Sequence, residues 1–340
     1  MSFHRFKQVF ATLSVLAVFV AGACSVDDVK GESSALVSEE VKSAAAGEGE
    51  VIVVRNNWTG QMISSEVGAQ VLERMGFEIE IQTLDSIAMW PAIAKADNML
   101  QMEVWPPVQK PQMQEWIDDN GEATVVGENG YAGTEGWYVP TYVIEGDEER
   151  GIEPTCPGLP DYQALNDCVE IFATSSSGSK GRYLSGDPSW GEYYGDEQRI
   201  ENLGLDYVME FAGSEAALAA EIKRAYDRGE PILALMWFPH FITSRYDLTQ
   251  IEFPPYTEEC WKTTYACGWE DGPAFKVVSD EFEQRFPLAY QVVEKIEIPT
   301  DALVDMIVRV DGDGLTVEEA ASEWLDDNED TWTSWVPEVN

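Results

Sequence analysis

Four tryptophans stand where an extended run of the sequence breaks beside glycine, proline or a turn: Trp58, Trp105, Trp190 and Trp237. An aromatic face attracts a cation that cannot donate a conventional hydrogen bond, such as a quaternary ammonium or a sulfonium, with roughly 0.5 to 2 kcal/mol from each face. A single tryptophan at such a place is usually an ordinary core residue, but four of them favour a ligand-binding cleft. Stacking on a sugar is the alternative chemistry for the same side chains.

Polar groups that could bind the other end of such a ligand are few. His240 closely follows Trp237 and could supply a hydrogen bond or a positive charge to a carboxylate. A purely structural histidine is the alternative. Backbone N–H groups around Gly191 could contribute, as loop amides do for anions. The remaining candidate ligand-binding residues are Asn57, Tyr131 and Trp137.

Sequence patterns for catalysis, nucleotide binding and metal binding are incomplete. The run Thr174–Gly181 is rich in Ser and Gly but lacks the spacing of a phosphate-binding loop, and Asp311–Gly314 does not complete a calcium loop. There is no Gly-x-Ser-x-Gly, and 62 acidic residues produce carboxylate pairs by chance. We therefore expect no enzymatic activity, no cofactor and no metal; a secreted hydrolase is the alternative from another class.

The balance of acidic and basic residues limits the kinds of partner that this protein can bind. The 340 residues include 21 basic and 62 acidic ones, a formal net charge of -41. Such a charge repels nucleic acid and anionic lipid headgroups. A solvated acidic surface suited to salty surroundings is the simplest interpretation, since screening shortens the range of self-repulsion.

The N-terminus has the layout of a secretory signal over residues 1–23. Arg5 and Lys7 precede the apolar run Val9–Val20, which is short for a spanning helix. The small residues before Cys24 resemble a bacterial lipoprotein cleavage site, so we expect lipidation of Cys24 and an exported, periplasmic or cell-surface protein. Residues 24–50 lack aromatic side chains and are expected to form a disordered tether.

The four remaining cysteines are an even number in an exported protein, which suggests disulfides. We expect the local pairs Cys156–Cys168 and Cys260–Cys267, because each closes a short loop rich in turn formers. Free or cross-paired thiols are the alternative. A metal site is not expected, because no Cys-x-x-Cys or clustered His accompanies these cysteines.

The first part of the folded chain is expected to be a β-strand, a helix and a second strand. Val51–Val54 predicts the first strand, and Phe77–Ile81 alternates as the second. Between them, apolar residues from Val67 to Met75 share one helical face, and Gly76 stands where a helix usually ends. The three elements predict a βαβ unit.

The second half carries the strand nearest to the candidate chemistry. The apolar run Ile232–Trp237 is bounded by prolines and predicts a strand buried on both faces. Trp237 and His240 then fall at its carboxyl end, where open α/β sheets place their ligands. Val169–Ala173 is expected to be another strand.

Two helices have clear termini. Ser214 is expected to cap a helix that ends at Gly229. Thr316 and Glu319 have the spacing of a capping box at the start of a later helix.

Short motifs in a fixed order resemble the substrate-binding proteins of glycine betaine/proline betaine/choline ABC transporters. The likeness runs from about Val51 to the C-terminus. It implies an α/β, two-lobed periplasmic-binding-protein (type II) fold, with mixed sheets flanked by helices and joined by a hinge. The motifs are Trp-x-Pro-His at 237–240 with Tyr246-Asp247-Leu248 after it, Asn-Trp-Thr-Gly at 57–60, Gly136 to Tyr142, and Pro254-Pro255-Tyr256-Thr257.

The resemblance also implies domain limits, partners and the absence of catalysis. Lobe 1 would comprise residues 51–138 plus 251–340, and lobe 2 residues 139–250. The protein would deliver an osmolyte to an ABC permease with its own ATPase, and would touch the membrane only through its lipid anchor.

Carried over by motif, each tryptophan receives a place in an aromatic cage. Trp58 matches the cage Trp of the choline-binding branch, and Trp237 matches the Trp of its Trp-x-Pro-His. Trp105 resembles the cage Trp that precedes a proline in both branches. Trp190-Gly191 resembles the Pro-x-Trp-Gly turn of some betaine binders.

Two positions depart from the family's pattern. Gly60 stands where the choline branch carries an Asp for the choline hydroxyl, and Gln109 lies where some betaine binders carry a His. The carboxylate contacts could therefore be rearranged onto His240. We expect glycine betaine or a related quaternary-ammonium or sulfonium osmolyte; choline, dimethylsulfoniopropionate or a sugar are the alternatives.

Overall fold

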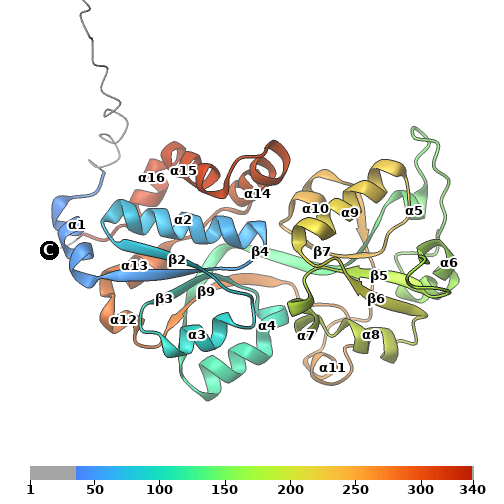
Figure 1. The fold of residues 1–340 in the computed structure, drawn as a ribbon, viewed down its shortest axis with the longest axis horizontal. Coiled ribbons are helices and arrows are strands. Elements are labelled where there is room, and N and C mark those ends of the chain that lie inside the picture. Colours follow the sequence, from blue (N-terminus) through green and yellow to red (C-terminus); the bar gives the residue numbers. More distant parts are fainter. Residues whose placement is uncertain (1–35, 339–340) are drawn as a thin grey trace, which may run out of the picture.

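The computed structural model describes residues 36–338, which form two lobes side by side (Figure 1). Each lobe has a sheet with helices on both faces, and β4 runs through both. The hydrogen-bonded strand order is β2-β1-β3-β9-β4-β7-β5-β6, and β8 pairs with β4. The strands are β1 (Glu50–Arg55), β2 (Glu78–Thr83), β3 (Met99–Val104), β4 (Ala123–Pro140), β5 (Gly181–Ser185), β6 (Tyr207–Phe211), β7 (Ala234–Phe238), β8 (Leu248–Gln250) and β9 (Gly272–Ser279).

The α-helices cover these strands in both lobes. They are α1 (Glu39–Glu48), α2 (Thr59–Met75), α3 (Met89–Lys95), α4 (Pro106–Met113), α5 (Tyr142–Glu145), α6 (Val169–Phe172), α7 (Gly191–Tyr194), α8 (Asp196–Asn202), α9 (Glu215–Arg228), α10 (Phe241–Arg245), α11 (Glu258–Thr263), α12 (Phe282–Arg285), α13 (Pro287–Lys295), α14 (Thr300–Val308), α15 (Val317–Asp327) and α16 (Glu329–Thr333).

The first lobe is built on β1, β2, β3, β9 and the beginning of β4. β1 pairs in parallel with β2 and β3, whereas β9 runs antiparallel to β3 and β4. The order β1, α2, β2 confirms the predicted strand–helix–strand unit. α2 ends at Gly76 with φ of 103°, a left-handed conformation that favours glycine.

The second lobe is built on β5, β6, β7, β8 and the end of β4. β5 pairs in parallel with β6 and β7, and β7 runs antiparallel to β4 with Trp237 opposite Glu135. The predicted strand at Ile232–Trp237 is confirmed as β7, which begins two residues later and is buried from Ala234 to Trp237. It is a central strand of a sheet with helices on both sides, which explains why both of its faces are apolar.

The predicted helix caps are also present. The Ser214 hydroxyl accepts the backbone N–H of Ala217 at 3.2 Å, and α9 ends at Gly229 in a left-handed conformation. Thr316 and Glu319 form a reciprocal capping box at the start of α15.

The strand prediction at Val169–Ala173 is wrong, because this segment forms the short helix α6. Its hydrogen bonds are local, as shown by the Ile171 N–H bonded to the Cys168 carbonyl at 3.2 Å. Only Phe172 of the helix is buried. The β-branched residues that suggested a strand therefore have no sheet face to cover, and β5 takes the place beside β6 instead.

The expectation of a disordered tether over residues 24–50 is wrong for residues 39–48, which form α1. Ser38 caps this helix by accepting the Val41 N–H at 3.3 Å. Val41 and Ala45 are buried and face the first lobe, where α1 contacts α2 and α13. An i, i+4 apolar pair thus buries enough surface to fix a stretch that is otherwise small and polar. The signal sequence over 1–23 and Cys24 lie outside the described residues.

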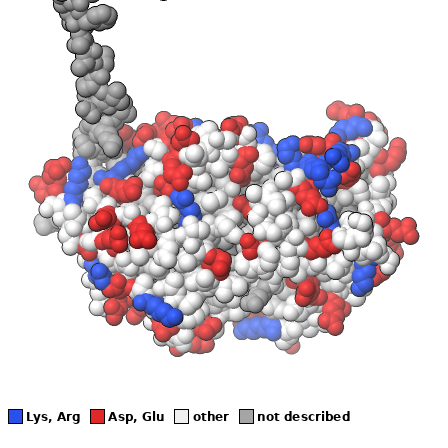
Figure 2. All heavy atoms as spheres, viewed as in Figure 1, with Lys and Arg blue, Asp and Glu red and all other residues white. Residues whose placement is uncertain are grey.

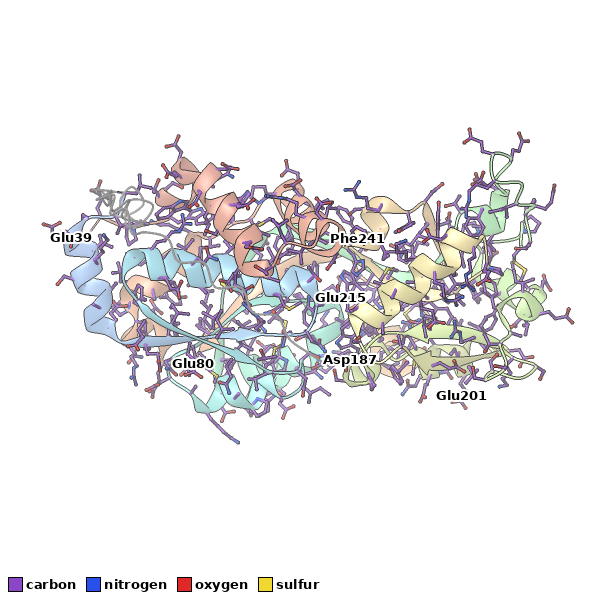
Figure 3. The ribbon with its side chains drawn as sticks, turned by 45° about the horizontal axis from the view of Figure 1, so that its top comes forward. Glu39, Glu80, Asp187, Glu201, Glu215 and Phe241 are labelled. Carbon is purple, nitrogen blue, oxygen red and sulfur yellow. A yellow bond between two sulfur atoms is a disulfide. The ribbon has the colours of Figure 1, made fainter. Side chains whose placement is uncertain are left out.

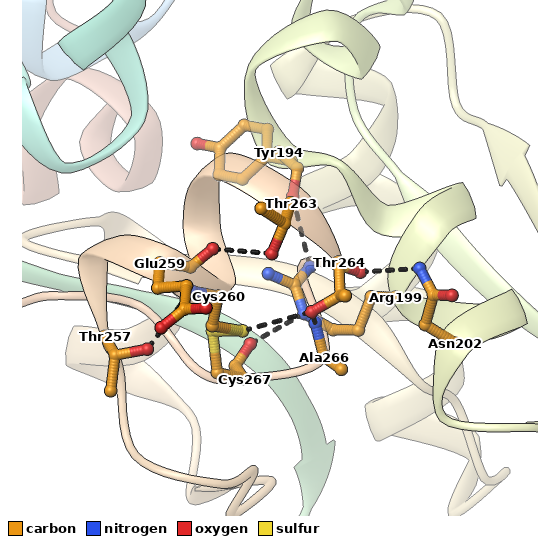
Figure 4. The surroundings of a disulfide bond; sticks show 10 residues. All are labelled: Tyr194, Arg199, Asn202, Thr257, Glu259, Cys260, Thr263, Thr264, Ala266 and Cys267. Carbon is orange, nitrogen blue, oxygen red and sulfur yellow. Dashed lines mark hydrogen bonds between the residues drawn. A yellow bond between two sulfur atoms is a disulfide. The ribbon is translucent and has the colours of Figure 1, made fainter.

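The segment between β8 and β9 packs on the second lobe. Arg199 of α8 donates from Nε to the Cys267 carbonyl at 3.0 Å, and the Asn202 amide donates to the Thr264 carbonyl at 2.8 Å. Figure 4 shows both contacts beside the Cys260–Cys267 disulfide. We keep the two-lobe division as a proposal, and these contacts favour placing the return to lobe 1 at β9 rather than at residue 251.

The four cysteines of the described chain are bonded in pairs. Cys156 is joined to Cys168, and Cys260 is joined to Cys267. These pairings stay a prediction for the protein in solution, and mass spectrometry of non-reduced peptides tests both.

Across residues 36–338, none of the helices has the length and apolar character needed to cross a membrane. Within the same residues there is also no group of three or more His, Cys, Asp or Glu side chains placed to hold a metal ion.

Candidate ligand-binding site

A cavity lies between the lobes and brings together all four candidate tryptophans. About 400 Å³ of space there is not filled by atoms, part of it open to solvent. Both lobes contribute to its wall, because Trp58 and Trp105 belong to the first and Trp190 and Trp237 to the second. The lining residues are Trp58, Ser86, Trp105, Val108, Gln109, Glu135, Trp190, Tyr193, Tyr194 and Trp237.

The Trp190 indole stands nearly perpendicular to those of Trp58 and Trp237. The ring centres of Trp58 and Trp190 are 6.2 Å apart at an interplanar angle of 82°, and those of Trp190 and Trp237 are 5.5 Å apart at 83°. Edge-to-face contact of this kind is a favoured aromatic geometry. Perpendicular rings at one corner give a ligand more than one aromatic wall to contact.

Each tryptophan is positioned by the end of an element. Trp58 directly precedes α2 and Trp105 directly precedes α4, each just after a parallel strand of the first lobe. Trp190 ends the short 3-10 helix η4 (Pro188–Trp190), and Trp237 lies near the carboxyl end of β7. This is the edge at which open α/β sheets bind ligands.

Two glycines give the indoles room. A Cβ on Gly133 would lie 2.7 Å from the Trp105 ring and 2.4 Å from the carbonyl oxygen of Phe238. A Cβ on Gly186 would lie 2.2 Å from the Trp190 ring. Neither distance is sterically possible without movement, so the ring positions require glycine behind them.

A buried carboxylate bonds to two of the cage indoles. Oε1 of Glu103 accepts the Nε1–H of Trp58 at 2.6 Å and that of Trp105 at 2.8 Å. Its Oε2 accepts the Ser64 hydroxyl at 3.0 Å and the Tyr131 hydroxyl. Burial raises the pKa of Glu103, and the four hydrogen bonds oppose that rise.

A second carboxyl, that of Glu135, lines the cavity itself. Its Oε1 accepts the Tyr194 hydroxyl at 2.8 Å. Its Oε2 is buried and has no hydrogen-bond partner within residues 36–338. Burial raises the pKa of Glu135 to about 7. The group can therefore offer either a proton or a negative charge to a ligand near neutral pH.

Sequence reasoning did not find Glu135, Glu103 or Tyr194. A signal for Glu135 exists, since it is the one acidic residue in the extended aromatic run 131–143. An acid inside an otherwise apolar strand is costly to bury unless it has a function or a partner.

The other polar groups at the cavity are neutral. Among the described lining residues there is no Lys, Arg or His. Ser86 Oγ and Gln109 Oε1 are buried and lack hydrogen-bond partners within the described chain. A ligand in this cavity would thus meet aromatic faces, neutral amide or hydroxyl groups and one carboxyl.

The remaining candidates are not among the lining residues. Tyr131 lies behind Trp105, with ring centres 6.0 Å apart. Trp137 stacks on Tyr183 at 3.9 Å and is fully buried. Gly191 begins α7, directly after the cage residue Trp190.

Asn57 joins the lobes beside the cavity. Its Nδ2 donates to Oδ2 of Asp187 at 2.8 Å, a contact from the loop before α2 to the turn that carries Trp190. Figure 3 labels Asp187 at the junction of the two halves of the molecule. The contact therefore links a first-lobe loop to a second-lobe wall of the cage.

His240 also lies where the lobes meet, outside the cavity lining. Its Nδ1 accepts the Ile242 N–H at 2.9 Å, which leaves the proton of a neutral imidazole on Nε2. That Nε2 is 3.0 Å from Oε1 of Glu215. The other oxygen of Glu215 accepts the backbone N–H of Thr59, at 2.8 Å, in the first lobe. His240 thus lies against a carboxylate that reaches across to α2, although the geometry of the two facing atoms does not make a hydrogen bond.

Comparison with known proteins gives a consistent set of relatives. Residues 49–327 match the model of a family described as the substrate-binding domain of ABC-type glycine betaine transport systems. The chain is 33% identical over 312 residues to the trimethylamine N-oxide-binding protein of Pelagibacter ubique, covering 87% of this chain and 93% of that protein. It is 25% identical over 126 residues to the glycine betaine/carnitine transport binding protein GbuC of Listeria monocytogenes, covering 37% of this chain and 38% of that protein.

Solved structures share the fold at lower sequence identity. The glycine betaine/L-proline-binding protein ProX of Borrelia burgdorferi matches with a TM-score of 0.69 and 21% identity, covering 85% of this chain and 97% of that chain. Lactococcal OpuAC in its closed form with glycine betaine matches with a TM-score of 0.66 and 19% identity, covering 85% and 100%. These matches show a periplasmic-binding-protein fold, in agreement with the predicted α/β class.

Proposed function

This chain belongs to the family of substrate-binding domains of ABC-type glycine betaine transport systems, and we propose that its own ligand is trimethylamine N-oxide. As a member, it binds a small osmolyte and works with an ABC transporter, and it is not an enzyme. The choice among osmolytes is our proposal. It depends mainly on one observation, the buried Glu135 Oε2, which has no partner within the described chain, in an aromatic cavity whose lining has no basic side chain.

The cage suits the methylated end of this ligand. Trimethylamine N-oxide has a positively charged nitrogen whose three methyl groups cannot donate conventional hydrogen bonds. Such a group is stabilised by aromatic faces. The walls formed by Trp58, Trp105, Trp190 and Trp237 supply those faces.

Glu135 suits the oxygen of the ligand. The N-oxide oxygen is negatively charged and accepts hydrogen bonds. With its pKa raised to about 7, the Glu135 carboxyl is largely protonated at slightly acidic pH, so Oε2 can donate to that oxygen. A hydrogen bond to a charged acceptor is among the stronger ones in proteins.

Glycine betaine, the ligand implied by the sequence motifs, suits the cavity less well. Its carboxylate would find no cationic side chain among the described lining residues, and Glu135 would repel it when ionised. Burying a charge without a partner is costly. The relationship to the Pelagibacter protein, whose name specifies trimethylamine N-oxide, supports the same choice.

Isothermal titration calorimetry at pH 6.5 tests the proposal. We expect trimethylamine N-oxide to bind at least tenfold more tightly than glycine betaine, choline or dimethylsulfoniopropionate, and glucose not to bind. The variant Glu135→Leu should lose most of the affinity for trimethylamine N-oxide. Tighter binding of glycine betaine than of trimethylamine N-oxide would contradict the assignment.

We also propose that the protein is exported and anchored through Cys24, with residues 1–23 removed. The arrangement of basic, apolar and small residues before Cys24 supports this. Mass spectrometry of the mature N-terminus should find a lipid on Cys24, and Cys24→Ser should release the protein from the membrane fraction. A mature chain that begins elsewhere would argue against the anchor.

A further inference from the structure

Glu103 is a buried carboxyl that lies behind the aromatic walls instead of in the cavity. It is 1% exposed, near the end of β3, and is not among the residues that line the cavity. Trp58 and Trp105, which it bonds, do line the cavity. From this position, Glu103 does not contact a ligand in the cavity directly.

The hydrogen bonds of Glu103 saturate its acceptor capacity. An ionised carboxylate has about four acceptor sites. Two are occupied by the indole N–H groups of Trp58 and Trp105, at 2.6 and 2.8 Å. The other two are occupied by the hydroxyls of Ser64 and Tyr131. None of the ion pairs found within residues 36–338 includes Glu103, so neutral donors provide its stabilisation.

The same network is braced from behind. The Tyr131 hydroxyl lies 2.7 Å from the Ser64 hydroxyl and accepts the Asn129 amide at 3.0 Å, and the Ser64 oxygen also lies 2.9 Å from the Gly60 carbonyl oxygen. These contacts tie the carboxylate to α2 and β4. Because every partner is fixed by backbone elements, the two indole N–H groups have one well-defined acceptor.

We propose that Glu103 is the positioning residue for two walls of the cage, holding the Trp58 and Trp105 rings in their binding orientation before the ligand arrives. This inference rests on the proposed function. A wall already fixed loses less conformational freedom on binding, which favours affinity. When the carboxyl is ionised, its charge also increases the negative potential at the indole faces, which attract the cation.

Two substitutions separate the hydrogen bonds from the charge. Glu103→Gln keeps Oε1 as an acceptor for both indoles and places an NH₂ toward the two hydroxyls, which must then accept instead of donate. The charge is lost while the indole hydrogen bonds remain. Glu103→Leu removes the acceptors as well. We expect the Gln variant to bind trimethylamine N-oxide within about fivefold of wild type, and the Leu variant to bind at least twentyfold more weakly.

A matched control distinguishes a specific effect of Glu103 on affinity from a general loss of stability. Leu100→Ala alters the same strand at a fully buried position that does not line the cavity, so it should lower the melting temperature but leave the affinity of the folded protein unchanged. If Leu100→Ala weakens binding as much as Glu103→Leu does, the role of Glu103 is structural only.

A spectroscopic measurement reports the positioning without any ligand. In protein labelled with ¹⁵N-tryptophan, the indole N–H signals of Trp58 and Trp105, assigned with the Phe variant of each, should be shifted downfield and slow to exchange with water. Both features should persist in Glu103→Gln and disappear in Glu103→Leu. Unchanged signals in the Leu variant would overturn the inference.

The two proposals fail in different ways. Wild-type protein that binds no methylated amine overturns the proposed function while the indole signals still test the role of Glu103. Wild-type protein that binds trimethylamine N-oxide, together with a Glu103→Leu variant of equal affinity, overturns the present inference alone.

Discussion

The Glu135 carboxyl predicts how binding depends on pH. We take the complex to hold one proton between Glu135 and the N-oxide oxygen. The affinity is then independent of pH while the carboxyl of the free protein is protonated, and it decreases at pH values where that carboxyl ionises. With a pKa of about 7, affinity for trimethylamine N-oxide should decrease above pH 7 by up to about tenfold per pH unit. Calorimetry between pH 6 and pH 9 measures this slope.

The surroundings of Glu135 determine its pKa, and a variant that cannot titrate is the control for that experiment. Burial raises the pKa of Glu135 most, the Tyr194 hydroxyl opposes the rise, and the charges of Asp196, Glu103 and Asp271 add to it. Glu135→Gln keeps a donor but cannot titrate, so its affinity should be nearly independent of pH. A Gln variant with the wild-type slope would assign the proton to another group.

The variant Trp237→Ala measures how much a single aromatic wall contributes to the affinity for the ligand. Trp237→Ala removes one aromatic face and should weaken binding of trimethylamine N-oxide at least tenfold, since about 1.4 kcal/mol corresponds to a factor of ten. Trp116→Ala is the control, because Trp116 is partly buried and does not line the cavity. Equal affinities for the wild type and the Trp237 variant would remove Trp237 from the site.

The tryptophans could be predicted from the sequence, whereas the two carboxyls could not. A Trp that follows a strand beside glycine or proline has an identifiable place at the edge of a sheet, so type and position together select it. Glu103 and Glu135 are two among 62 acidic residues; the aromatic run around Glu135 is the one sequence signal, and Glu103 has none. His240 was predicted at the carboxyl end of β7, but its partner Glu215 belongs to another helix, α9, which spacing alone could not bring beside it.

At the scale of elements, the N-terminus of α2 is capped from the other lobe. Trp58 occupies the N-cap position but provides no side-chain hydrogen bond. Oε2 of Glu215, the first residue of α9, accepts the Thr59 N–H at 2.8 Å and lies 3.3 Å from the Thr59 hydroxyl. Figure 3 labels Glu215 between the two halves of the molecule. A carboxylate at a helix N-terminus is stabilising, and here it is available only when the lobes are together.

Glu215 should therefore favour the ligand-binding arrangement of the lobes without touching the ligand. Glu215→Ala should weaken binding about threefold to thirtyfold, since loss of an N-cap typically costs about 0.5 to 2 kcal/mol. Asp227→Ala on the same helix is the control, because Asp227 is exposed and pairs only with the exposed Lys223 at 2.6 Å.

Two measurements distinguish this cap from a cage contact. Small-angle scattering of the ligand-free Glu215→Ala protein should give a larger radius of gyration than wild type, and the saturated protein should match wild type. Weaker binding with an unchanged scattering profile would place Glu215 in the site rather than in the contact between lobes.

Elements were predictable where local signals and burial agreed. β1, α2 and β7 have apolar patterns of the correct period and clear end signals, and all three are present. α6 and α1 were missed because their outcome depends on distant parts of the chain. The place beside β6 is occupied by β5, and the apolar side of α1 needs α13 and α2 to cover it.

For the whole molecule, the dominant feature is the net charge of -41. Acidic side chains are spread over the face shown in Figure 2 and outnumber basic ones there. Like charges on one surface oppose the folded state, and salt reduces this by shortening the Debye length from about 10 Å at 0.1 M to about 3 Å at 1 M. Because the folded chain is more compact than the unfolded one, its like charges repel more strongly, so screening acts mainly on the folded state.

Stability should therefore rise with salt while affinity for a neutral ligand does not. Between 0.05 M and 1 M NaCl we expect the melting temperature to rise by about 5 °C, which corresponds to roughly 3.5 kcal/mol for a chain of this size. KCl should act equally, because screening does not depend on which monovalent cation is present.

Trimethylamine N-oxide carries no net charge, so its dissociation constant should change less than twofold, whereas choline, a cation, should bind more weakly as salt increases. A melting temperature that rises with only one of the two salts would indicate specific ion binding in place of screening. A melting temperature that rises with neither would show that repulsion between the acidic residues does not destabilise the folded protein.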